Sequence, residues 1–131
     1  MENEHVDVFH LEDEVSIRIF LEREVRKSGL KYHGFTNLQD LSSVMSNNQP
    51  KFLVMNTVVR SYGLPMLAEN VVPDLRKNHP NVKILFYSSD DVTAENLAEK
   101  YGAEYYCVGV STARDVVDGI VKILRGGENG K

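Results

Sequence analysis

The chain has 131 residues, of which 42% are hydrophobic and 26% are charged, and its formal net charge is −4. This length and balance predict one globular domain with a real core. An acidic chain is poorly suited to follow a phosphate backbone, which argues against direct nucleic-acid binding. The one cysteine, Cys107, has no internal disulfide partner, and no apolar run reaches the roughly 20 residues that cross a bilayer. We therefore expect a cytoplasmic protein with no membrane segment.

Short apolar runs alternate with helical patterns along the whole chain, as in a doubly wound parallel sheet. Five strands in strict alternation with five helices favour an α/β, flavodoxin-like (βα)5 three-layer sandwich with strand order 2-1-3-4-5. Residues 1–125 are expected to form the domain, and residues 126–131 a flexible tail or the start of a linker. The expected strands cover residues 5–11, 31–35, 52–56, 82–87 and 104–108, and the expected helices cover residues 15–27, 38–46, 64–77, 94–101 and 113–124.

Local signals mark the ends of the first two helices. Gly29 is suited to the left-handed position that follows a helix. Thr36 and Gln39 have the Thr-x-x-Gln spacing of a capping box at the start of the second helix. Four apolar side chains of the first helix share one face and are expected to be buried: Ile17, Phe20, Leu21 and Val25.

The third helix carries two prolines. Residues 57–63 are expected to form a loop before it. Pro65 suits the first turn of a helix over residues 64–77, whereas Pro73 removes an internal hydrogen bond and is expected to kink or split it.

Polar residues stand where the central strands end. Glu12 and Asp13 follow the first strand, Asn56 ends the third, and Ser88 follows the fourth. Because parallel strands present their carboxyl ends at one edge, these residues are expected to converge in one crevice. His10, inside the first strand, is expected to be a hydrogen-bonded core histidine.

Four short motifs occur in the order and spacing of one known family: FHLEDE, PKFLVMN, ILFYSS and GAEYYCVGV. Over residues 5–125 the chain resembles the receiver domain of two-component response regulators. The resemblance implies an Mg²⁺-binding acidic pair at Glu12 and Asp13, a switch hydroxyl at Ser88 and a switch aromatic at Tyr106.

Two positions depart from the family pattern. Asn56 stands where the family has its phosphoacceptor aspartate, and Gly109 and Val110 stand where it has Lys-Pro. A carboxamide is a poor nucleophile, and glycine supplies no cation to stabilise a phosphoryl group. The two changes also balance, since one removes a negative charge and the other a positive charge. The sequence therefore predicts a degenerate, or pseudo-, receiver that is held in one signalling state, with no enzymatic activity and no cofactor beyond weak Mg²⁺.

The resemblance also implies a docking face. In the family, helix four, strand five and helix five often bind a kinase, an effector or another receiver, including a second copy. Here that face corresponds to residues 94–101, 105–108 and 113–124, with Tyr101 and Tyr105 as candidate contacts.

Two other functions stay open. A receiver could be phosphorylated at Thr57 or Ser61, or could bind a ligand or metal in the acidic crevice through Glu12, Asp13 and Asn56. An unrelated enzyme or cofactor protein could use the same fold. The acidic segment after the first strand would repel a flavin phosphate, however, and neither a P-loop nor a nucleophile elbow occurs.

Overall fold

The computed structural model describes residues 6–87, 99–100, 104–105 and 117–122 of the chain. Helical turns also occur at residues 99–100 and 117–122. No helix in these ranges is long and apolar enough to cross a membrane. The elements are β1 (Val8–Leu11), α1 (Val15–Lys27), β2 (Tyr32–Phe35), α2 (Leu38–Met45), β3 (Phe52–Asn56), β4 (Val58–Ser61), β5 (Leu64–Leu67), a 3₁₀ turn (Ala68–Asn70), α3 (Val72–Asn78), β6 (Lys83–Tyr87) and β7 (Glu104–Tyr105).

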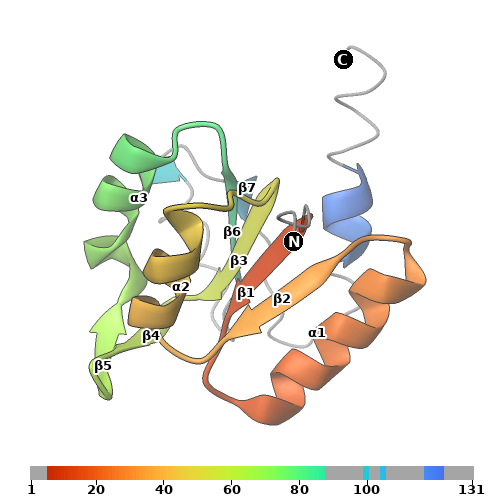
Figure 1. Ribbon diagram of the computed structural model, residues 1–131, viewed down its shortest axis with the longest axis horizontal. Helices are drawn as coiled ribbons and strands as arrows, with labels where there is room; N and C mark the ends of the chain where they lie inside the picture. The colour runs from red at the N-terminus through yellow and green to blue at the C-terminus, as the bar shows by residue number, and fades with distance from the viewer. Residues whose placement is uncertain (1–5, 88–98, 101–103, 106–116, 123–131) are drawn as a thin grey trace.

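The main sheet is parallel, with strand order β2-β1-β3-β6-β7. With the separate β4–β5 hairpin set aside, this is the predicted order 2-1-3-4-5. The flavodoxin-like α/β class is confirmed. In Figure 1, α2 and α3 cover one face of the sheet, while α1 and the helix at residues 117–122 lie on the other.

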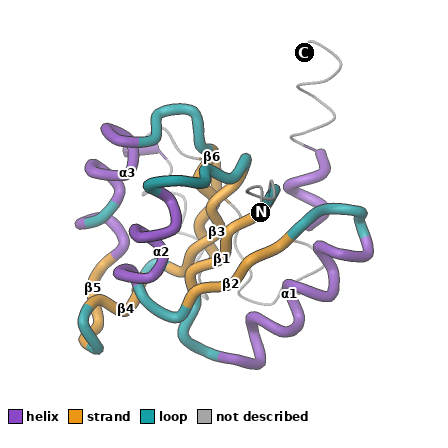
Figure 2. Tube along the Cα trace, in the orientation of Figure 1, coloured by secondary structure: helices purple, strands orange, loops and turns teal. Residues whose placement is uncertain are grey.

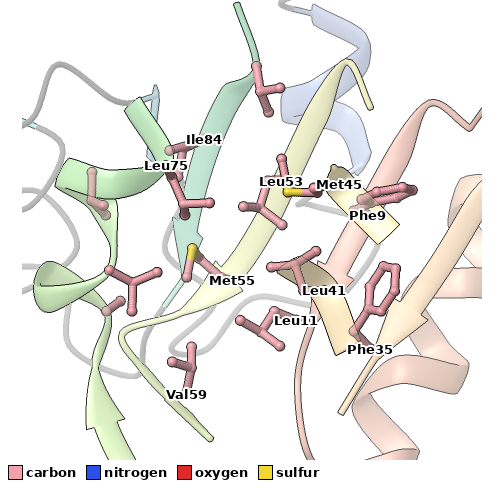
Figure 3. Close-up of a cluster of buried hydrophobic side chains, with 14 of the residues drawn as sticks. Phe9, Leu11, Phe35, Leu41, Met45, Leu53, Met55, Val59, Leu75 and Ile84 are labelled. Carbon is pink, nitrogen blue, oxygen red and sulfur yellow. The ribbon is translucent and has the colours of Figure 1, made fainter. Parts of the chain in front are cut away.

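The strand β3 is the central strand of the sheet, and its side chains belong to the core on both faces. Its residues from Phe52 to Met55 are fully buried, as the uninterrupted apolar run predicts. Alternate side chains serve opposite faces: Leu53 and Met55 pack with α2 and α3 in the cluster of Figure 3, and Phe52 and Val54 pack on the α1 side.

Helix α1 spans the residues predicted for it. Leu21 and Val25 are buried, and Gly29 after the helix has the expected positive φ of 82°. Phe20 is 56% exposed, so its assignment to the buried face was wrong. The helix buries a narrower stripe than its apolar residues suggest, and Phe20 lies under the guanidinium of Arg23 instead.

A β-hairpin, β4–β5, replaces the expected loop at residues 57–63 and the first half of the expected third helix (Figure 2). Tyr62 and Gly63 both have positive φ, 53° and 79°, which is the backbone of a two-residue hairpin turn. Pro65 therefore lies in β5 and starts no helix. Pro73 kinks nothing, since it lies in the first turn of the short α3.

The capping box predicted at Thr36 does not form. Asn37 caps α2, and its side-chain oxygen accepts a hydrogen bond from the backbone N–H of Asp40 at 3.0 Å. Gln39 is thereby free to contact the hairpin: its Nε2 donates to the Ser61 hydroxyl at 3.0 Å, and its Oε1 accepts from the Tyr62 N–H at 2.7 Å.

Candidate functional site at the carboxyl edge of the sheet

Three adjacent strands bring polar side chains to one edge of the sheet. Leu11 of β1 is in register with Met55 of β3, so Glu12 and Asn56 lie at neighbouring strand ends. Asn56 is in turn in register with Tyr87, the last residue of β6. Three further residues of the predicted site lie outside the described part of the chain: Ser88, Tyr106 and Gly109.

Glu12 is turned inward and is only 4% exposed. One carboxylate oxygen, Oε1, accepts a hydrogen bond from the Tyr87 hydroxyl, and the other accepts from the Glu14 N–H at 3.1 Å. Burial raises the pKa of Glu12, and these two hydrogen bonds oppose the rise. Burial and the neighbouring Glu12 also raise the pKa of Tyr87, so its hydroxyl keeps its proton as the donor.

His10 extends this contact into the centre of the sheet. It is fully buried, its Nε2 lies 2.8 Å from the Tyr87 hydroxyl, and its Nδ1 lies 2.7 Å from the Tyr32 hydroxyl. Because the Tyr87 proton goes to Glu12, Nε2–H must donate to Tyr87 and Tyr32 must donate to Nδ1. Burial, assisted by Arg18, lowers the pKa of His10 to about 3 and keeps the ring neutral. The expectation of a hydrogen-bonded core histidine is confirmed.

Asp13 points toward the hairpin and away from the core. Arg60 of β4 donates from Nε to Asp13 Oδ2 at 3.1 Å, and this hydrogen bond holds the pKa of Asp13 below its usual range. Arg60 was not among the predicted site residues, because residues 57–63 were expected to form a loop. The β-branched pair Val58-Val59, followed by Gly63 in a turn position, is the signal that could have revealed a strand and a hairpin turn.

The amide oxygen of Asn56 is also engaged. It accepts a hydrogen bond from the backbone N–H of Thr57 at 2.6 Å, with the Thr57 hydroxyl at 3.4 Å. Ser61, the other hydroxyl weighed as a phosphoacceptor, is 8% exposed and bonded to Gln39.

The oxygens of the predicted cation site are already engaged by the protein. Glu12 Oε1 and Oε2, Asp13 Oδ2 and Asn56 Oδ1 all accept hydrogen bonds from the protein. Within the described residues, no three or more His, Cys, Asp or Glu side chains are grouped so that they could hold a metal ion. Mg²⁺ would have to compete with the Arg60 guanidinium for Asp13.

Neither a scan of protein-family models nor a search of curated proteins found a match. Solved structures do match. A CheY-like response regulator receiver domain protein from Methanospirillum hungatei JF-1 has a TM-score of 0.79 at 12% identity, over 98% of this chain and 100% of that one. The chemotaxis response regulator CheY4 of Vibrio cholerae has a TM-score of 0.77 at 11% identity, over 92% and 99%.

HP1043, an orphan response regulator of H. pylori, is also similar, with a TM-score of 0.72 at 16% identity, over 89% of this chain and 94% of that one. At such low identities the likeness concerns the path of the backbone, and it extends over nearly the whole chain. The chain therefore has the flavodoxin-like fold of response regulator receiver domains.

Proposed function

We propose that this chain is a pseudo-receiver, a signalling domain that binds protein partners without accepting a phosphoryl group at the usual position. The observation that carries the proposal is Asn56 at the carboxyl end of β3, with its Oδ1 bonded to the Thr57 N–H at 2.6 Å. A receiver that is phosphorylated needs a carboxylate nucleophile at this strand end, and an amide is neither charged nor nucleophilic enough.

The ion pair beside Asn56 supports the same proposal. Arg60 lies 3.1 Å from Asp13, at the edge where a phosphorylated receiver would recruit a divalent cation. A fixed guanidinium partly neutralises the acidic pair without any ligand, so the electrostatics of the site need not change during signalling. We infer that the domain, residues 1–125, is held in one state.

Titration with Mg²⁺ and beryllofluoride, followed by backbone NMR shifts, tests this proposal. We expect no saturable shifts at Glu12, Asp13 or Asn56, because the nucleophile position carries no negative charge and Arg60 occupies Asp13. A saturable response like that of a phosphorylated receiver would contradict the proposal.

A restored variant serves as the positive control. Asn56→Asp combined with Gly109→Lys returns the family's carboxylate and cation, and we expect acetyl phosphate to phosphorylate this double variant at residue 56. If the double variant is phosphorylated and the wild type is not, the wild-type fold is an intact receiver scaffold that lacks only the reactive carboxylate and the cation.

We propose that the partner is a kinase, an effector or another receiver and that it docks on residues 94–101, 105–108 and 113–124, the face implied by the resemblance. A pull-down with the wild-type chain and with the double variant tests this. Capture of the same partner by both would show that binding is independent of phosphorylation.

Phosphorylation at another hydroxyl is the second candidate, and the structure offers it little support. Ser61 is buried and accepts a hydrogen bond from Gln39, whereas Thr57 is half-buried beside Asn56. Mass spectrometry of the wild-type chain after treatment with acetyl phosphate separates the two functions. A phosphate on Thr57 or Ser61 would favour a receiver with a displaced acceptor.

A further inference from the structure

A groove of about 430 Å³ is lined by residues of α2 and α3, and neither Glu12 nor Asp13 lines it. Figure 1 shows α2 and α3 side by side on one face of the sheet. Apolar side chains form its floor, and three of them, Met45, Val71 and Leu75, are buried. Its rim consists of exposed polar side chains, namely Ser42, Ser46, Asn70, Asp74 and Asn78. An apolar centre within a polar rim is the arrangement of protein interfaces, and this volume can hold large side chains.

His79 lines the same groove and has an unsatisfied ring nitrogen. Its Nδ1 is buried and has no hydrogen-bond partner, a condition that no other side-chain atom in the described ranges shares. A buried polar atom without a partner destabilises a fold. The groove therefore favours an occupant with an apolar body and one hydrogen-bonding group.

The hairpin beside the groove carries such a side chain. Met66 of β5 lines the groove, so the two features are adjacent on one molecule. Tyr62, at the tip of the hairpin, is 82% exposed, and its neighbour Leu64 is 68% exposed. Tyr62 has φ of 53°, where asparagine or glycine would fit the backbone better. The folding of the turn therefore does not explain why an aromatic residue stands there.

We propose that two copies of this chain form a dimer by a reciprocal exchange of contacts. Tyr62, at the hairpin tip of each copy, enters the α2–α3 groove of the other copy. The ring would cover the apolar floor formed by Met45 and Leu75. The phenolic hydroxyl both donates and accepts, so it can satisfy Nδ1 of His79 in either tautomer of the ring.

Because the hairpin and the groove are adjacent on each copy, both contacts can form at once in a symmetric dimer. When both features lie side by side on each copy, one two-fold axis places both hairpins over both grooves, and the dimer is complete. Each tyrosine buries on the order of 150–250 Å², which is a fraction of the roughly 800 Å² per partner in a standard interface. The dimer is therefore expected to depend on concentration. It uses neither Asn56 nor the acidic pair, so it is independent of the proposed function.

Sedimentation velocity of the full chain over a range of concentrations tests the exchange. The wild type is expected to dimerise. Tyr62→Asn, which suits the turn backbone but removes the ring, is expected to raise the dimer Kd by about 100-fold, or about tenfold for each lost contact. Ser42→Arg, which places a long side chain in the groove from α2, is expected to have a similar effect. Ser43→Arg, at the next position of α2, which is exposed but does not line the groove, is the matched control and is expected to dimerise normally.

A photo-crosslinking phenylalanine derivative at position 62 identifies the occupied surface. Crosslinks between copies to residues 38–46 or 66–79 support the exchange. Three results would overturn it: a wild-type monomer at every concentration, a dimer that persists in Tyr62→Asn, or crosslinks that map to α1.

Discussion

The Nε2 atom of His10 lies 2.8 Å from the Tyr87 hydroxyl, and the same hydroxyl donates to Glu12 at the edge of the sheet. The centre of β1 is thus joined to its own carboxyl end through a side chain of β6. With Tyr32 on the other ring nitrogen, four buried polar groups from three strands satisfy one another. They form a linear chain from Tyr32 through His10 and Tyr87 to Glu12, so the removal of one group leaves its neighbours in the chain without that partner.

Replacement of Tyr87 by phenylalanine tests this dependence. The change leaves both His10 Nε2 and Glu12 Oε1 buried without a partner, and we expect the free energy of unfolding to fall by about 2–4 kcal/mol. Urea denaturation at neutral pH measures it. Ser43→Ala is the control, since Ser43 is exposed on α2 and the loss of its hydroxyl should change stability by less than about 0.5 kcal/mol.

The stability of the fold should decrease in acid because of His10. Its pKa is 6.5 in an unfolded chain and about 3 in the folded protein, so the unfolded state binds more protons between these values. The stabilisation is complete above pH 6.5 and is lost as the pH falls toward 3, by up to about 1.4 kcal/mol per pH unit. Glu12 has the opposite effect on stability. Because its pKa is raised on folding, its protonation as the pH falls favours the folded state.

Urea midpoints measured from pH 7 to pH 4 would reveal this slope. We expect His33→Asn, a change at an exposed position of β2, to keep it and His10→Asn to flatten it. An unchanged slope in His10→Asn would show that another group is responsible.

Removal of Arg60 should expose Asp13 to cations. In Arg60→Ala we expect binding of Mg²⁺ or Mn²⁺ at least about fivefold tighter than the detection limit set by the wild type, because a positive charge 3.1 Å from the carboxylate is lost. Stability should change by less than about 1 kcal/mol, since the paired side chains are 43% and 38% exposed. Broadening of the Glu12 and Asp13 amide signals by Mn²⁺ measures binding. Arg26→Ala, which breaks the exposed pair with Glu22, should leave the affinity unchanged.

Gln39 should control the order of the hairpin tip. Gln39→Ala removes the bonds to the Ser61 hydroxyl and the Tyr62 N–H, and we expect faster hydrogen exchange at the Tyr62 amide and a loss of about 1–2 kcal/mol. Gln49→Ala, at an exposed position before β3, is the control and should leave that amide protected. Equal hydrogen exchange of the Tyr62 amide in both variants would mean that the turn is ordered without the hydrogen bonds from Gln39.

The sheet could be predicted because the local sequence of its strands carries a recognisable pattern. Phe52 to Met55 form an uninterrupted apolar run, which is typical of a parallel strand buried on both faces. The placement of Glu12 and Asn56 at one edge then follows from the parallel order alone. The use of His10 in the core was also predictable, because a histidine inside a buried strand must find partners.

The partners themselves were beyond the reach of the sequence. Tyr87 is 77 residues from His10, and Arg60 is 47 residues from Asp13, so neither contact follows from any local spacing. The hairpin was missed for a different reason. The residues at 64–77 have an apolar pattern that also suits a helix, and the turn at Tyr62–Gly63 decides between the two only when its positive φ is recognised.

The two ends of the hairpin are pinned together, because the N–H of Ala68 donates to the carbonyl of Thr57 at 2.8 Å. The segment between them leaves and re-enters the fold at nearly one point. None of the pairs that set the register of the parallel sheet involves that segment. Its contacts with the rest of the fold include the packing of Val59 and Met66, the Arg60–Asp13 pair and the bonds to Gln39. Residues 58–67 thus form a unit with its own two-stranded pairing, outside the five-stranded sheet and joined to it at one point.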